Sequence, residues 1–316
     1  MKKNYIYYAL MAVSLLVAAC GSDDDSSPRS VEVNKNANGR DKSEYAVRTE
    51  MPKVMKGTNY VILVKHDDEI GVNYIVEWDC IKRAQRWTCW EWNSRNNTKG
   101  WERKKWDGAS WMGKVWTGDP FQPDEEIPAD FRTELSDYKG SGYDRGHICA
   151  SEDRICSQNV NGQTFFLSNM HPQINKFNAQ VWAKMESKVR TWRDATVGNG
   201  GTLYVCKGGT LYDVFLNGKT VAGTLTKNPS TQASNENLRM PVPKYFFMAV
   251  MKKTAAGMYC GMAFWAEHKA DNSSNLTPYM ITINELEQRT GYDFFCNLPD
   301  VVEEQMEATL DVTEWK

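Results

Sequence analysis

Two polar clusters in the middle of the chain constrain its fold and its chemistry more than any other feature of the sequence. The first is Tyr143-Asp144-Arg145-Gly146-His147, and the second is SNMHPQINKFNAQVWAKMESKVR, residues 168–190. His147 is one of only four histidines in the chain, and it alone stands beside an arginine and an aspartate. The preceding glycine permits close backbone approach to a ligand, and imidazole is the side chain best matched to general-base work near neutral pH. The first cluster is therefore a candidate catalytic loop, with an ordinary loop histidine as the alternative.

The second cluster predicts a helix from about Ile174 to Trp192. Its apolar residues recur at three- and four-residue steps: Ile174, Phe177, Val181, Trp182, Met185 and Val189. Asn178, Trp182, Glu186 and Arg190 step by four and share one broad side of this helix. Glu186 and Arg190 can therefore contact each other. An amphipathic core helix with ordinary polar residues outward is the alternative.

The spacing along this helix limits how a metal ion can be held. Asn178 and Glu186 lie about 12 Å apart along the axis, at about 1.5 Å per residue. One Mg²⁺ ion, which binds oxygens at about 2.0–2.1 Å, cannot be held directly by both side chains. If Asn178 is the direct ligand, Glu186 acts through a metal-bound water.

The remaining pattern predicts one α+β domain. Runs rich in β-branched and aromatic residues predict strands at 60–64, 72–78, 164–167, 203–206, 245–251 and 258–265. Short helices are predicted at 282–290 and 301–310, in addition to the helix at 174–192. Neighbouring hairpin strands with separate helices are typical of the α+β class.

Residues 81–116 combine positive charge with aromatic side chains. Nine lysines and arginines stand against three acids there, and seven of the twelve tryptophans lie in the same stretch. Such a mixture suits phosphate contact with base stacking, but a tryptophan-rich packing layer with solvated lysines explains it equally well. The whole chain carries a formal net charge of −2, which excludes a generally basic nucleic-acid coat and leaves only a local patch for a polyanion.

The N-terminus reads as a targeting segment. Lys2 and Lys3 precede an apolar run that is too short for a membrane-spanning helix, and Val17-Ala18-Ala19-Cys20 follows. This resembles a bacterial lipoprotein signal with Cys20 as the lipidated residue, and the acidic run after it resembles the surface-export signal of Bacteroides-type lipoproteins. We expect a signal peptide at residues 1–19, a disordered tether at 20–57 and a folded domain at 58–316, exported and lipid-anchored to the outer membrane at the cell surface. A plain secretory signal is the alternative.

Seven cysteines remain after Cys20. Export favours disulfides, and an odd number leaves at least one free thiol. Cys80 with Cys89 and Cys149 with Cys156 are the local candidates.

Taken together, the two clusters resemble the DNA/RNA non-specific endonuclease family. The resemblance rests on Tyr143-Asp144-Arg145-Gly146-His147, on Leu167-Ser168-Asn169-Met170 with Pro172-Gln173, and on Asn178-x-x-x-Trp182-x-x-x-Glu186-x-x-x-Arg190. It covers about residues 60–300 and implies a ββα-metal (His-Me finger) fold, with a central antiparallel sheet flanked by helices. It also implies Mg²⁺-dependent cleavage of DNA and RNA to 5′-phosphate ends, with Mn²⁺ as a possible substitute.

The resemblance assigns roles to individual residues. His147 is the general base, Asn178 the direct Mg²⁺ ligand and Glu186 the organiser of metal-bound water. Arg145 and Arg190 stabilise the phosphate, and Asp144, Lys114 and Trp182 are the candidate substrate contacts. Family members often carry an arginine before a tryptophan upstream of the histidine motif. Lys114-Val115-Trp116 is the nearest match here, and lysine lacks the guanidinium fork.

Two other function classes remain open at this stage. One is a catalytically inactive surface lipoprotein that binds nucleic acid or glycan through residues 81–116. The other is a zinc hydrolase, which is weakly supported because HExxH and recognisable histidine spacings are absent. No protein partner is evident.

Overall fold

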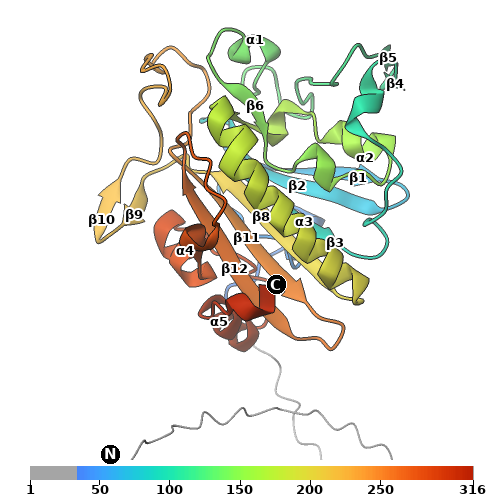
Figure 1. The fold of residues 1–316 in the computed structure, drawn as a ribbon, viewed down its shortest axis with the longest axis vertical. Helices are drawn as coiled ribbons and strands as arrows, with labels where there is room; N and C mark the ends of the chain where they lie inside the picture. The colour runs from blue at the N-terminus through green and yellow to red at the C-terminus, as the bar shows by residue number, and fades with distance from the viewer. Residues whose placement is uncertain (1–33, 316) are drawn as a thin grey trace, which may run out of the picture. The chain divides into compact units, whose positions relative to one another are not determined.

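A seven-stranded antiparallel sheet runs through the centre of residues 34–315, the part of the chain that the computed structural model describes (Figure 1). Its strand order is β1-β2-β3-β8-β11-β12-β13. The strands are β1 (Tyr60–Asp67), β2 (Gly71–Asp79), β3 (Ala84–Trp92), β8 (Thr202–Gly209), β11 (Tyr245–Lys253), β12 (Tyr259–Glu267) and β13 (Met280–Ile281). The predicted strands other than 164–167 are confirmed, because long apolar runs with period-two alternation suit a sheet covered on both faces.

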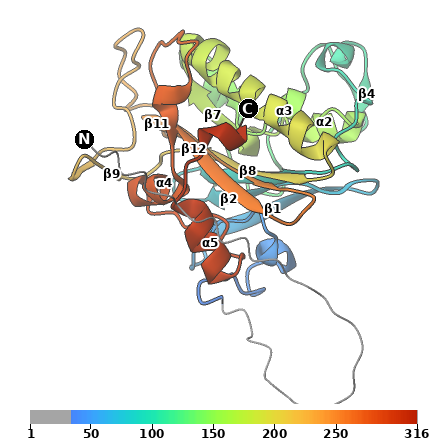
Figure 2. The same cartoon turned by 60° about the horizontal axis from the view of Figure 1, so that its bottom comes forward.

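Helices cover both faces of this sheet. α3 (Ala183–Gly198) continues from η5, a π-helical turn at Phe177–Trp182, and lies on one side, whereas α4 (Ile283–Thr290) and α5 (Asp300–Glu307) lie on the other (Figure 2). Alternate residues of β11 serve the two cores: Phe246, Met248 and Val250 pack with α3, and Phe247, Ala249 and Met251 pack with α4 and α5. The three predicted helices are confirmed, with α3 extended to Gly198.

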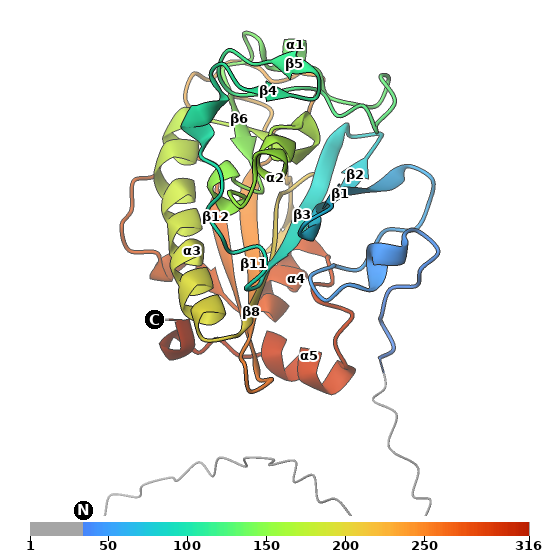
Figure 3. The same ribbon diagram turned by 90° about the vertical axis from the view of Figure 1, so that its right-hand side faces the viewer.

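Residues 93–201 form an excursion between the neighbouring strands β3 and β8. Within it, β6 (Asp144–His147) pairs antiparallel with β7 (Met170–Gln173), and η5 with α3 follows directly. The hairpin β4 (Ser110–Trp111) and β5 (Lys114–Val115), α1 (Leu135–Tyr138) and β6 gather at one end of the sheet (Figure 3). α2 (Gln158–Gln163) precedes the predicted strand 164–167, which is a turn with one isolated bridge from Phe166 to Gln122.

The remaining elements are short. They are the hairpin β9 (Val214–Leu216) and β10 (Lys219–Val221), and the 3₁₀ turns η1 (Glu44–Val47), η2 (Arg103–Trp106), η3 (Ser151–Asp153), η4 (Leu167–Asn169), η6 (Thr277–Tyr279) and η7 (Val312–Trp315). Among residues 34–315, no helix is both long and apolar enough to span a membrane.

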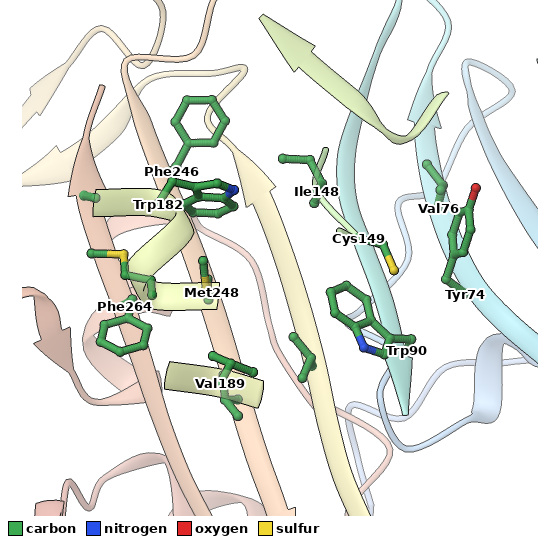
Figure 4. Close-up of a cluster of buried hydrophobic side chains, with 14 of the residues drawn as sticks. Tyr74, Val76, Trp90, Ile148, Cys149, Trp182, Val189, Phe246, Met248 and Phe264 are labelled. Atoms are coloured by element: carbon green, nitrogen blue, oxygen red, sulfur yellow. The ribbon is translucent and has the colours of Figure 1, made fainter. Parts of the chain in front are cut away.

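Trp182 lies in the core between α3 and the sheet (Figure 4). Its side chain is 1% exposed, stacks on Phe177 at 5.8 Å between ring centroids and meets Phe246 edge-on at 5.4 Å. The prediction that Trp182 contacts substrate is therefore wrong, because the indole faces the sheet rather than solvent.

The tryptophans of residues 81–116 form a packing layer. Buried members are Trp87, Trp90, Trp92, Trp106, Trp111 and Trp116. Trp106 packs on Trp101, Trp111 and Phe165 with ring centroids 5.3, 5.5 and 6.2 Å away. Other side chains cover these rings, so they offer no surface on which a base or a sugar could stack. Binding of nucleic acid or glycan through this stretch would need such a surface.

Residues 34–57 are ordered against the domain, and the domain boundary predicted at residue 57 lies too late. Asn34 donates from Nδ2 to the carbonyl of Cys296 at 3.1 Å, and the buried Asn38 donates to the carbonyls of Ala46 and Pro52 at 3.1 and 2.9 Å. Met51 is fully buried in the α4/α5-side core. In this segment, hydrogen bonds from asparagine side chains to backbone carbonyls take the place of regular secondary structure. The predicted signal peptide and the lipidation site Cys20 lie outside the described residues.

All seven cysteines after Cys20 are unpaired, so neither predicted disulfide forms in the structure. Cys89 belongs to the α4/α5-side core, whereas Cys80 packs against the α3-side core. Cys149 is buried in the α3-side core, and Cys156 is only partly buried outside it. Proximity in sequence misled the first pairing because the two thiols serve opposite faces of the sheet.

A cluster of carboxyl groups joins α4 and α5 to the N-terminal segment. Asn36 donates from Nδ2 to Asp293 at 3.2 Å and to Glu303 at 3.0 Å. Burial, and then the neighbouring carboxyl groups Glu287 and Glu303, raise the pKa of Glu307. A carboxyl whose pKa is raised in the folded state contributes to stability while it is protonated. This contribution is lost as the pH rises from the ordinary carboxyl pKa of 4.5 through the pKa in the folded protein.

Glu307→Gln is therefore expected to stabilise the protein by about 1–3 kcal/mol at pH 9 and to have little effect at pH 5. Denaturant unfolding at the two pH values measures the difference. Glu304→Gln, at an exposed position of the same helix, is the control. Equal stability of the Glu307→Gln protein and the unmutated protein at pH 9 would contradict a repulsive cluster.

Candidate active site

The β6–β7 pair holds the first polar cluster against the start of the helix. Asp144 lies opposite Gln173 in this ladder, and His147 lies opposite Met170. Gly146 packs directly on the buried Gln173, so that an added Cβ would stand 2.3 Å from the Gln173 side-chain amide. Glycine is needed here for space.

His147 presents a neutral imidazole with a free ring nitrogen. Its ring meets Phe165 edge-on at 4.9 Å and lies 5.4 Å from the ring of Phe121. Burial, and then the charges of Arg103 and Arg145, lower the pKa of His147 to about 3. Its Nε2 has no hydrogen-bond partner among the described residues. A buried nitrogen without a partner is costly, which indicates that it is reserved for a ligand or a proton.

Asp144 fixes the amide of Asn178. Asn178, in the π-helical turn η5, donates from Nδ2 to Oδ2 of Asp144 at 3.1 Å, and Asn175 donates to the same oxygen at 3.1 Å. With its NH₂ group engaged, the amide of Asn178 keeps its oxygen available as an acceptor. Asp144 therefore acts on Asn178, a role that its sequence position did not reveal. Asn178 lies in a π-helical turn, and such turns are frequent at functional sites.

Two arginines line a pocket beside Asp144 and Asn178, and His147 lies behind it and is not one of the lining residues. The exposed Arg145 lies with its guanidinium 4.0 Å above the ring of Phe121, and Arg103 is held by an ion pair with Asp119. Arg103, Arg145, Asp144 and Asn178 all line a pocket of about 520 Å³. The pocket thus combines two guanidinium groups with one available amide oxygen.

Arg103 takes the place for which Lys114 was predicted. Lys114 lies on β5, where its ammonium stands 4.0 Å above the Trp116 ring, and it does not line this pocket. The sequence contains a signal for this arginine, because Arg103 precedes Trp106 in the run Arg-Lys-Lys-Trp. Lys114 lacks the guanidinium fork that Arg103 presents to the pocket.

Glu186 and Arg190 lie in one buried ionic network but do not pair with each other among the described residues. Glu186 is 3.2 Å from Nζ of Lys207, and Arg190 is 2.9 Å from Asp153. Lys207 also reaches Asp153 at 3.2 Å. The predicted contact between Glu186 and Arg190 is replaced by partners from the sheet and from η3, which the helix periodicity alone does not show.

The site suits a hydrated divalent cation better than a closed metal centre. Within residues 34–315, no group of three or more His, Cys, Asp or Glu side chains is arranged to hold a metal. Mg²⁺ sheds water reluctantly and is bound with few protein ligands, and the amide oxygen of Asn178, oriented by Asp144, is one such ligand. The residues present therefore fit the Mg²⁺ that the sequence predicts.

The fold is the α+β, ββα-metal fold, with a central antiparallel sheet flanked by helices, as predicted. A crystal structure of the EndoG/EndoGI complex shares it, with a TM-score of 0.56 at 22% identity over 74% of this chain and 86% of that chain. A sequence model of the DNA/RNA non-specific endonuclease family matches residues 62–301. The chain belongs to this family.

Individual relatives resemble it over part of their length. A nuclease of Syncephalastrum racemosum is 37% identical over 185 residues, which span 56% of this chain and 55% of that protein. A nuclease of Nostoc is 29% identical over 241 residues, 75% of this chain and 76% of that protein. Human mitochondrial endonuclease G is 27% identical over 56% of this chain and 57% of its own length.

Gly146→Ala is expected to destabilise the protein by about 1–3 kcal/mol, because the new methyl group displaces the buried Gln173 side chain. It should also lower activity, because any shift of β6 away from Gln173 moves His147, which lies on the same strand. Chemical denaturation and a cleavage assay measure both effects. Gly198→Ala, where a Cβ meets no atom within 4 Å, is the control. Unchanged stability of Gly146→Ala would show that Gln173 can move aside.

Proposed function

We propose that the protein is a divalent-metal-dependent endonuclease that hydrolyses phosphodiester bonds of both DNA and RNA and leaves 5′-phosphate ends. The observation that carries the proposal is the neutral, unpartnered imidazole of His147 beside two guanidinium groups. Family membership and the names of the relatives support the reaction class. Mg²⁺ is the proposed cation, with Mn²⁺ as a substitute.

The residues divide the reaction between them. His147 accepts a proton from the attacking water as the general base. Arg145 and Arg103 contact the phosphate oxygens and offset the negative charge that grows in the transition state. Asn178, held by Asp144, is the metal ligand, and the cation supplies charge stabilisation to the phosphate and to the leaving oxygen.

Glu186 and Arg190 act from the helix. The Glu186 carboxylate accepts hydrogen bonds from water around the metal site. Arg190 keeps about a quarter of its side chain exposed, at 24%, although it is paired with Asp153. It therefore retains donors for a phosphate oxygen.

A cleavage assay with supercoiled plasmid and with RNA tests the proposal. We expect both substrates to be degraded with Mg²⁺ or Mn²⁺, no degradation with a chelator, and 5′-phosphate at the new ends. Resistance of both substrates across the metal series would overturn it. Cleavage that leaves 3′-phosphate would refute the proposal that the bond between phosphorus and the 3′-oxygen is the one broken.

We also propose that the protein is exported and anchored to the outer membrane through a lipid on Cys20, where it degrades nucleic acids outside the cell. The support is the sequence Val17-Ala18-Ala19-Cys20 with its acidic run. Metabolic labelling with a fatty acid tests the anchor, and Cys20→Ser is expected to abolish the label. Protease treatment of intact cells tests surface exposure.

A further inference from the structure

A fully buried lysine lies between the sheet and the helix that carries Glu186. Lys207 is 0% exposed and sits on β8, opposite Thr88 of β3 and Met248 of β11. α3 runs across this face of the sheet (Figure 1). The Lys207 ammonium stands 5.0 Å from the centre of the Trp90 ring and 5.8 Å from that of Trp182. A lysine in such a place is rare unless it is paired.

Lys207 bridges two carboxylates. Its Nζ is 3.2 Å from Oδ2 of Asp153 and 3.2 Å from Oε1 of Glu186. The second oxygen of Asp153 accepts from Arg190 at 2.9 Å. Positive and negative groups thus alternate from Arg190 through Asp153 and Lys207 to Glu186. Arg190 already pairs with Asp153, so Lys207 is the cation that is placed on Glu186.

We infer that Lys207 is a positioning residue for the proposed reaction, because its ammonium holds the Glu186 carboxylate in place and ties it through Asp153 to Arg190. This inference rests on the proposed function and deepens it. Lys207 lies beneath the helix and does not line the pocket, so it acts on the reaction through Glu186 and not by touching substrate.

The charges around Glu186 explain why it needs this lysine. Burial raises the pKa of Glu186, Lys207 is the strongest influence against that rise, Asp153 raises the pKa further, and Arg190 lowers it less than Lys207 does. Four further titratable groups interact with members of the network: His147 with Asp153 and Lys207, Glu152 with Arg190, Arg154 with Asp153, and Cys149 with Lys207. Burial raises the pKa of the Cys149 thiol to about 12, so it is neutral. Without Lys207, the pKa of Glu186 is expected to rise further, because burial and Asp153 then act without their strongest opponent. A protonated Glu186 no longer accepts hydrogen bonds with both oxygens.

The test compares Lys207→Met with Lys188→Met. Lys188 lies on α3 and stands 5.6 Å from the Trp192 ring, away from Glu186. Lys207→Met is expected to lower kcat about 10- to 100-fold at pH 7, the usual range for a supporting partner of a metal site, with KM little changed. Activity should recover as pH rises, because a higher pH ionises Glu186 again. Lys188→Met and the unmutated protein should show no such recovery.

A second measurement does not need activity. The ¹³C signal of the Glu186 carboxyl, identified by its loss in Glu186→Gln, reports whether the group is ionised. We expect this carboxyl to titrate at a higher pH in Lys207→Met than in the unmutated protein. If the unmutated protein cleaves nothing, the proposed function fails, and this titration still decides whether Lys207 controls Glu186.

Two further variants separate positioning from folding. Lys207→Arg keeps the charge and should keep Glu186 ionised. The double variant Lys207→Met with Glu186→Gln removes both partners and should be no less active than Glu186→Gln alone. A folded Lys207→Met protein with unchanged kcat and an ionised Glu186 would overturn the inference. An additional loss of activity in the double variant would do the same, because it would assign Lys207 a role apart from Glu186.

Discussion

Replacing His147 with alanine is expected to lower kcat for phosphodiester cleavage by about 10²- to 10⁴-fold, the range that general-base catalysis contributes. The imidazole has no hydrogen-bond partner at Nε2 among the described residues, so little structure is lost with it. KM should change little, because Arg103 and Arg145 remain to contact phosphate. Steady-state cleavage of a fluorescent oligonucleotide at saturating Mg²⁺ measures both constants.

The matched control is His66→Ala, at an exposed position on β1, which should retain full activity. Cleavage by the His147→Ala protein within threefold of the unmutated rate would remove His147 from the mechanism.

The acid side of the pH profile follows from the pKa of His147, which is lowered to about 3. A lowered pKa means that the base stays unprotonated as pH falls, and a bound cation lowers it further. We therefore expect His147 to cause no loss of kcat/KM between pH 7 and pH 5. An unperturbed imidazole would lose half of its neutral form near pH 6.5. An acid limb centred near 6.5 that disappears in the His147→Ala background would contradict this value.

Asn178→Ala is expected to weaken binding of Mn²⁺ and to lower cleavage at limiting Mg²⁺ by about 100-fold or more. A catalytic cation supplies several kcal/mol of charge stabilisation, and 1.36 kcal/mol corresponds to a factor of ten. Isothermal titration with Mn²⁺ measures the binding without reference to activity, and cleavage over a Mg²⁺ series measures the rate.

Asn175→Ala serves as the control because Asn175 donates to the same oxygen of Asp144 as Asn178 does. It should leave Mn²⁺ affinity within a few-fold. Equal effects of the two variants would mean that Asn178 only supports Asp144 and is not the ligand.

The local parts of this structure are predictable from the sequence. Apolar runs located the long strands, and the three-and-four spacing located the helix at Asn178. Each signal lies within a single element and repeats with its period. The α+β class follows from the same patterns.

Features that depend on contacts between elements could not be predicted from the sequence. The step-by-four pattern placed Trp182 and Glu186 on one side of the helix but does not say which side faces the sheet. Lys207 follows an apolar strand run, and nothing in its neighbours shows that Asp153 and Glu186 come to meet it. Composition also failed for residues 34–57, where Asn34 and Asn38 side chains bond backbone carbonyls and order a polar segment.

The excursion of residues 93–201 leaves the sheet after β3 and returns at β8, and these two strands are direct neighbours. Closing so long a loop costs conformational entropy before the hydrogen bonds of the β3–β8 ladder form and offset that cost. Lys207, on the returning strand, meets Glu186 only when that ladder is complete. Recovery of cleavage during refolding is therefore expected to require the β3–β8 ladder as well as the histidine hairpin, since a chain that has formed only the hairpin holds an incomplete catalyst.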